Sequence, residues 1–200
     1  DCPDKVPARR VETIEAAARQ RVPFTTGILV GIGERPDEIV DSLIALRSIQ
    51  DRHGHLQEFI IQNFRAKANT RMRFAPEPDI PYFVRVVALA RWILGAEANI
   101  QVPPNLTEGY GVYLDAGIND WGGVSPVTID WVNPEAPWPH LETLRSTTER
   151  AGFRLAARLP IYPEYMTSHW VDADLLAAAR ARTDADGYAA LSAVPIASQP

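Results

Sequence analysis

Four short apolar segments, separated from one another by helical patterns, constrain the fold of this chain more than any other feature. The first, residues 24–31, is rich in aliphatic and β-branched residues and is typical of a strand buried on both faces of a parallel sheet. Regular alternation of such strands with helices predicts an α/β fold in which right-handed crossovers join parallel strands. The expected strands are 24–31, 58–64, 98–102 and 121–125.

Helical spacing of apolar residues marks the segments between and after these strands. The helix after the first strand begins near Pro36, with acidic residues in its first turn, and is broken at residues 53–55. The other expected helices cover 7–21, 81–94, 140–150 and 174–182, with a shorter, glycine-interrupted one at 106–118.

Four strands and their helices form either a small open sheet or half of an eight-stranded barrel. A complete TIM-type barrel needs about 250 residues, whereas this chain has 200 and its first element is a helix. We therefore expect residues 1–185 to form the C-terminal half of a (βα)8 barrel whose other half lies upstream. Residues 186–200 are expected to be a flexible tail or linker.

The composition limits the expected partners. The net charge of −5 argues against nucleic acid or an anionic membrane, which attract clusters of Lys and Arg. No apolar run approaches the roughly 18 residues of a membrane-spanning helix, and the N-terminus lacks the layout of a signal peptide. The single cysteine, Cys2, cannot form an internal disulfide. We expect a cytoplasmic protein that acts on a small molecule.

Polar residues gather where the expected strands end. In open and barrel-shaped parallel sheets alike, ligands bind at the carboxyl ends of the strands. These ends hold Glu34, residues 62–65, Asn105 and residues 119–123. The pattern predicts which face carries the site, but it does not identify a reaction.

Several of these segments have two interpretations. The glycines at 31 and 33 form either a tight turn or a bare backbone edge that an adenine or ribose can approach, and Pro36 stands where a dinucleotide fingerprint needs its third glycine. Residues 119–123 form either a turn with a core tryptophan or a surface that stacks on a flat ring. Residues 131–138 form either a rigid flap or a surface loop.

Cationic and histidine side chains near the second strand are equally open. Arg65 and Lys67 either hold a carboxylate or phosphate or belong to a solvated loop. His53 and His55 have a spacing that metal sites use, but no cysteine or acidic cluster lies near them in sequence, which favours a solvated loop.

Two motifs resemble those of radical-SAM enzymes. Residues 27–34 are similar to the G-x-I-x-G-x-x-E motif of the fifth barrel strand in that superfamily, with Leu29 in the place of isoleucine. Asn63 and Phe64 resemble the start of a sixth-strand motif of biotin-synthase-like members. The longer sequence at 118–139, with its Asn-Asp-Trp-Gly-Gly-Val-Ser-Pro string, is similar to the FO synthase family in particular.

The resemblance implies a set of site residues. S-adenosylmethionine (SAM) would contact Gly27, Gly31, Glu34, Asn63 and Phe64. The substrate would contact Gln62, Asn105, Asn119, Asp120 and Trp121. The resemblance assigns no catalytic residue and no metal ligand to this chain.

The resemblance also implies a reaction. A 4Fe-4S cluster on a C-x3-C-x2-C loop cleaves SAM reductively, and the 5′-deoxyadenosyl radical takes hydrogen from an adduct of a tyrosine-derived hydroxybenzyl group and 5-amino-6-ribitylaminouracil. Ring closure with loss of ammonia gives 7,8-didemethyl-8-hydroxy-5-deazariboflavin (FO). Such a lyase depends on a reductant and on an adduct-forming radical-SAM partner, as a subunit or a fused domain.

The sequence departs from this family at the cluster. It has one cysteine, whereas a cluster loop of this kind needs three thiolates. We therefore expect a fragment or split-gene product that is inactive by itself. The alternatives are another biotin-synthase-like radical-SAM enzyme, a cluster-free small-molecule-binding remnant, or an ordinary half-barrel lyase or isomerase.

Overall fold

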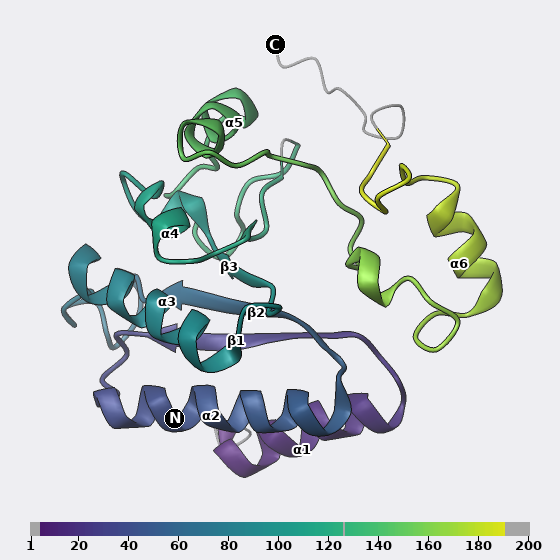
Figure 1. The fold of residues 1–200 in the computed structure, drawn as a ribbon. Helices are drawn as coiled ribbons and strands as arrows, with labels where there is room; N and C mark the ends of the chain where they lie inside the picture. Colours follow the sequence, from purple (N-terminus) through teal and green to yellow (C-terminus); the bar gives the residue numbers. More distant parts are fainter. Residues whose placement is uncertain (1–4, 126, 191–200) are drawn as a thin grey trace. The chain divides into compact units, whose positions relative to one another are not determined.

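Helices and strands alternate along most of the chain in the computed structural model, which describes residues 5–125 and 127–190 (Figure 1). The predictions that concern Cys2, Pro126 and the tail from residue 191 onward lie outside the described residues. The elements are α1 (Pro7–Arg19), β1 (Phe24–Val30), α2 (Pro36–His53), β2 (Leu56–Asn63), α3 (Ile80–Leu94), β3 (Ile100–Val102), η2 (Pro104–Leu106), α4 (Val112–Asp115), β4 (Asp120–Trp121), α5 (Leu141–Arg150), η3 (Pro163–Tyr165) and α6 (Ala173–Arg180).

The four strands form one sheet in the order β1-β2-β3-β4. The pairs β2–β3 and β3–β4 are parallel. Each strand therefore neighbours the next one in the sequence, without the reversal of order that marks an open doubly wound sheet. This confirms the predicted α/β class, and the order is that of part of a TIM-type barrel.

The strands toward the C-terminus are shorter than the sequence predicts. β3 begins at Ile100, two residues later than predicted, and ends at Val102 as predicted, before a pair of prolines that cannot donate to a ladder. β4 covers only Asp120 and Trp121, because the backbone turns at Gly123 with φ 68°. The helix expected over 106–118 is also wrong as one element, since glycines at 109 and 111 separate η2 from α4.

Burial along β1 contradicts one expectation. Residues 24–29 of this strand alternate between half-buried and exposed, Leu29 keeps 41% of its surface exposed, and only Val30 is buried. The prediction that 24–31 is buried on both faces is therefore wrong. β1 stands at one end of the strand order, and the described residues cover only one of its faces.

The register of β2, β3 and β4 separates the residues of the sheet into two faces. Phe59 of β2 lies opposite Ile100 of β3, and both are buried. On the other face Ile60 lies opposite Gln101, which in turn lies opposite Asp120. We call this second side the open face. Because side chains alternate along each strand, this face includes Glu58, Ile60, Gln62, Gln101 and Asp120, of which Glu58 and Gln101 are buried.

The chain divides into two compact units. The larger comprises residues 27–48 and 58–155, and its core includes the buried face of α3, with Phe83 packed edge-on against Tyr113 of α4. None of the described helices combines the length and the apolar character that crossing a lipid bilayer requires. The two compact units do not test the expected domains, 1–185 and 186–200, which stay predictions.

Of the described residues, the smaller unit comprises 5–26, 49–57 and 156–190. His55 lies within it, fully buried, with Nε2 3.0 Å from the carbonyl oxygen of Ile14. Burial lowers the pKa of this imidazole. The interpretation of His55 as part of a solvated loop is therefore wrong, because the ring fills a core position beneath α1.

Candidate functional site

The turn after β1 is closed by a carboxylate. The backbone N–H of Gly31 donates to Oε1 of Glu34 (2.6 Å), and that of Ile32 donates to Oε2 (2.7 Å). The chain can make this turn because Gly31 adopts φ 96°. The Glu of the 27–34 motif therefore braces its own loop, and both of its oxygens are engaged by backbone.

The two motif glycines are required by protein neighbours. A Cβ on Gly27 would lie 2.0 Å from the carbonyl oxygen of Ile60, and one on Gly31 would lie 2.6 Å from Cδ of Pro78. These contacts explain both glycines without a ligand. Their predicted contact with SAM stays a prediction.

The ends of β2 and β3 meet through asparagines. Nδ2 of Asn63 donates to the carbonyl oxygen of Leu106 (3.3 Å), and Nδ2 of Asn105 donates to Asp130 and to the carbonyl oxygen of Ala136, both at 2.9 Å. Oδ1 of Asn63 and Oδ1 of Asn105 are buried and accept no hydrogen bond among the described residues. Phe64 is also buried, 8% exposed, and its backbone N–H donates to Val30.

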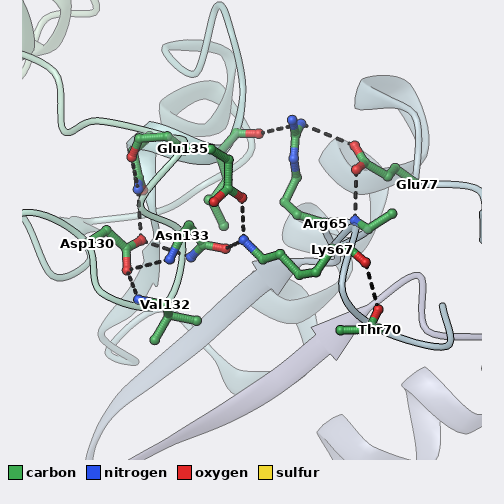
Figure 2. Close-up of polar contacts among 12 residues, drawn as sticks. Arg65, Lys67, Thr70, Glu77, Asp130, Val132, Asn133 and Glu135 are labelled. Atoms are coloured by element: carbon green, nitrogen blue, oxygen red, sulfur yellow. Dashed lines mark hydrogen bonds and ion pairs between the residues drawn. The ribbon is translucent and has the colours of Figure 1, made fainter. Parts of the chain in front are cut away.

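A polar network fixes residues 127–138, which we call the flap, against the end of β2 (Figure 2). Nζ of Lys67 donates to Oδ1 of Asn133 (2.7 Å) and pairs with Glu135. The hydrogen bond from Lys67 lowers the pKa of Glu135. Burial raises the pKa of Asp130, but hydrogen bonds from Asn133 and Asn105 outweigh that effect and lower it overall. The flap is thus held from two neighbouring strand ends.

Arg65 lies beside this network. It donates to the carbonyl oxygen of Leu106 (3.1 Å) and pairs with Glu77 at 3.2 Å, while Glu77 also accepts the backbone N–H of Ala66 (Figure 2). Arg65 and Lys67 therefore bind carboxylates of the protein itself. Residues 131–138 are thus braced against the protein, and whether they cover a site stays a prediction. The flap side chains of Val127, Ile129, Trp131 and Val132 are more than half exposed.

The three residues at β4 point in different directions. Oδ1 of Asn119 accepts from Arg91 (3.1 Å) and from the backbone N–H of Ile100 (2.8 Å). Trp121 is 7% exposed, and its Nε1–H donates to Thr148 of α5 (3.0 Å). Asp120 alone of the three belongs to the open face. The structure gives Asn119 and Trp121 structural partners, and the predicted ligand contacts of all three stay predictions.

Sequence reasoning missed Gln101. This residue lies mid-strand in β3, where an apolar neighbour on each side suggested a buried strand and nothing more. The structure puts it on the open face between Ile60 and Asp120. The position of Gln101 on this face follows only from the register of three strands. A lone Gln within an apolar run did, however, indicate a polar residue inside the sheet. Gln62 shares that face and is partly exposed.

No metal centre emerges from the described residues, since no three His, Cys, Asp or Glu side chains group together in residues 5–125 and 127–190. The whole sequence contains one cysteine. The residues present therefore do not fit a 4Fe-4S cluster, which thiolates hold.

Comparison with known proteins identifies close relatives. The chain is 50% identical over 185 residues to a protein of Streptomyces avermitilis named FO synthase, covering 91% of the chain and 22% of that protein. It is 49% identical over 188 residues to the 7,8-didemethyl-8-hydroxy-5-deazariboflavin synthase of Methanopyrus kandleri, covering 94% of the chain and 56% of that protein. The enzyme of the same name in Methanocaldococcus jannaschii is 49% identical over 170 residues.

The alignments cover most of this chain but only part of each relative. The chain spans about half the length of the deazariboflavin synthases, 56% and 47% in these two cases, and 22% of the Streptomyces protein. No protein-family model matches the chain. Over most of its own length, the chain is homologous to a portion of the FO synthases, the enzymes named for making 7,8-didemethyl-8-hydroxy-5-deazariboflavin.

Proposed function

We propose that this chain forms part of an FO synthase, a radical-SAM lyase that closes the deazaflavin ring with loss of ammonia. The observation that carries the proposal is the identity of 49–50% over 84–94% of the chain to proteins named for that product. Relatives at this level of identity support the proposal, whereas a shared barrel alone would say nothing about the reaction.

The cluster is the part that these residues do not supply. We propose that cysteines outside this sequence hold it and that the chain alone is inactive. When bound, the cluster and SAM supply the 5′-deoxyadenosyl radical that takes hydrogen from the substrate. A reducing compartment such as the cytoplasm suits a thiolate-held cluster and its reductant.

The chain's own residues would hold the organic part of SAM. Asn63 supports this role, because its buried Oδ1 lacks a donor among the described residues and can accept an N–H from a ligand. Glu34 supports SAM binding indirectly. Its carboxylate accepts the backbone N–H groups of Gly31 and Ile32 and so fixes the loop at the end of β1. A preorganised loop binds at a lower entropic cost than one that orders on binding.

The substrate would lie along the open face, beneath the flap. Gln62 and Asp120 offer polar groups there, and Asn105 links that region to the flap through Asp130. The exposed indole of Trp131, at the flap tip, can cover a flat ring and exclude water from it. Covering the ring also keeps reductants and other weakly bonded hydrogen donors away from a carbon-centred radical.

The test is SAM binding and cleavage by the native-length protein with its cluster rebuilt anaerobically. Calorimetry measures binding, and chromatography measures 5′-deoxyadenosine release after a reductant and substrate are added. Binding with release in the wild type, with affinity for SAM reduced roughly tenfold or more in Asn63→Ala, supports the proposal.

Asn69→Ala is the matched control for this test. The same side chain is removed, but Asn69 is exposed on the loop after β2, so both binding and release should stay at the wild-type level. Absence of SAM binding in the cluster-loaded wild-type protein would contradict the proposal. Failure of the native-length protein to take up a cluster would contradict it as well and favour a cluster-free binding remnant.

A further inference from the structure

Gln101 is the least explained polar residue of the open face. Its side chain is 4% exposed, and Oε1 accepts no hydrogen bond among the described residues. A buried acceptor without a donor destabilises a fold, so such groups are rare and usually mark a ligand, a water molecule or a functional constraint. Gln101 also lies away from the Asn63–Asn105 cluster in register, at the centre of β3.

A glycine makes room for this carboxamide. A Cβ on Gly122 would lie 1.9 Å from Oε1 and 2.8 Å from Cδ of Gln101. Gly122 does not have a positive φ, unlike Gly123 with φ 68°, so its backbone conformation does not itself require glycine. Space for Gln101 is therefore the structural reason for the first glycine of the Trp-Gly-Gly sequence.

The neighbours of Gln101 define the chemistry around it. By register, Gln101 lies between Ile60 of β2 and Asp120 of β4. A flat ring resting on Ile60 would present one edge to the Gln101 carboxamide, with the Asp120 side chain beyond it on the same side. A carboxamide offers an acceptor and a donor next to each other, which matches an imide, where an N–H stands beside a carbonyl.

We propose that Gln101 is a ligand-binding residue whose carboxamide pairs with the imide edge of the pyrimidinedione ring. This inference rests on the proposed function, because both the uracil part of the substrate and the deazaflavin product carry that imide. In the ligand-free chain the carboxamide rests over Gly122, and its Oε1 accepts no hydrogen bond from the described residues. A ligand N–H would pair with that oxygen once the side chain turns to another of its staggered rotamers.

Titration of the native-length, cluster-loaded protein with FO and with its N3-methyl derivative tests this pairing. Methylation removes the imide donor and leaves the rest of the ring system unchanged. Wild type should bind FO about tenfold or more tightly than the methylated compound. Gln101→Met, which keeps the side-chain length, should weaken FO binding to a similar extent and should not discriminate between the two compounds.

Gly122→Ala provides a second variant that leaves Gln101 in the sequence. Its Cβ displaces the carboxamide, so it should also change the preference for FO over the N3-methyl derivative, and thermal melting should show that both variants remain folded. Equal loss of affinity for both compounds, or no loss in Gln101→Met, would overturn the role of Gln101 while leaving the proposed function intact. Failure of the wild type to bind either compound would overturn both.

Discussion

Arg91 offers the sharpest test of how the site's scaffold is held together. From α3 its guanidinium donates to the carbonyl oxygens of Gly95 (2.9 Å), Ala96 (3.0 Å), Ala98 (2.7 Å) and Gly117 (2.6 Å), and to Oδ1 of Asn119 (3.1 Å). The same Asn119 oxygen accepts the N–H of Ile100 at the start of β3. One side chain therefore joins the end of α3 to the starts of β3 and β4.

The cost of removing this group follows from its partners. A hydrogen bond to a charged group contributes about 1.5–3 kcal/mol when water cannot reach the acceptor after the charged side chain is removed. The acceptors here are part-exposed loop groups that water reaches once the guanidinium is gone, so about 0.5–1 kcal/mol for each bond is the suitable value. We expect Arg91→Met to lower the free energy of unfolding by about 3 kcal/mol, and Arg91→Lys by about 2 kcal/mol, because an ammonium cannot reproduce the planar fork.

Urea unfolding of the native-length protein, followed by circular dichroism, measures both changes. Arg85→Met is the matched control, since Arg85 lies on the same helix, is exposed and contacts only the ring of Tyr82 in the described interactions, at 6.0 Å. It should change the free energy of unfolding by less than about 0.5 kcal/mol. Equal effects of Arg91→Met and Arg85→Met would refute the reasoning.

Three further predictions concern the site's supports. Glu34→Gln leaves one side-chain oxygen for the two backbone N–H groups of Gly31 and Ile32. We therefore expect the free energy of unfolding to fall by about 1 kcal/mol and calorimetry to show weaker SAM binding. Trp121→Phe should destabilise by about 1–2 kcal/mol through loss of its buried N–H contact, whereas Trp131→Phe, at a position 79% exposed, should leave the melting temperature unchanged. Because the folded pKa of Glu135 is below its ordinary 4.5, the contact with Lys67 is present above that pH and is lost as pH falls through the lowered value. Hydrogen exchange of flap amides should therefore accelerate, relative to the core, only below about pH 4.5. Lys67→Met should reduce that pH dependence and leave the part that Asp130 contributes.

The fold was predictable because its signals are local and repeated. Pro36 with two acids after it predicted the start of α2, and the apolar stripe ending at Gly95 predicted α3 and its end. Alternation of these helices with four apolar segments then gave the parallel sheet. The end of β3 before Pro103 was predicted as well, but the extent of β4 was not, because the turn at Gly123 depends on backbone geometry that residue composition does not reveal.

The site was predictable as a place, but the direction of each side chain was not. Reading residues from strand ends indicated Asn63, Asn105 and Asp120, yet it could not tell that Trp121, one residue after Asp120, turns toward α5. That distinction depends on the register between neighbouring strands. Gln101 was missed for the same reason, since a mid-strand residue becomes part of a face only when its partners are known.

The measurement that tests the central claim most directly is product formation. The native-length protein, with its cluster rebuilt anaerobically, is supplied with SAM, a reductant and the hydroxybenzyl-aminouracil adduct, and FO is quantified by mass spectrometry. We predict FO together with ammonia and 5′-deoxyadenosine in equal amounts, and none in a protein without its cluster. Cleavage of SAM without formation of FO, whatever happens to the adduct, would contradict the assignment to deazaflavin formation. It would favour another biotin-synthase-like radical-SAM reaction.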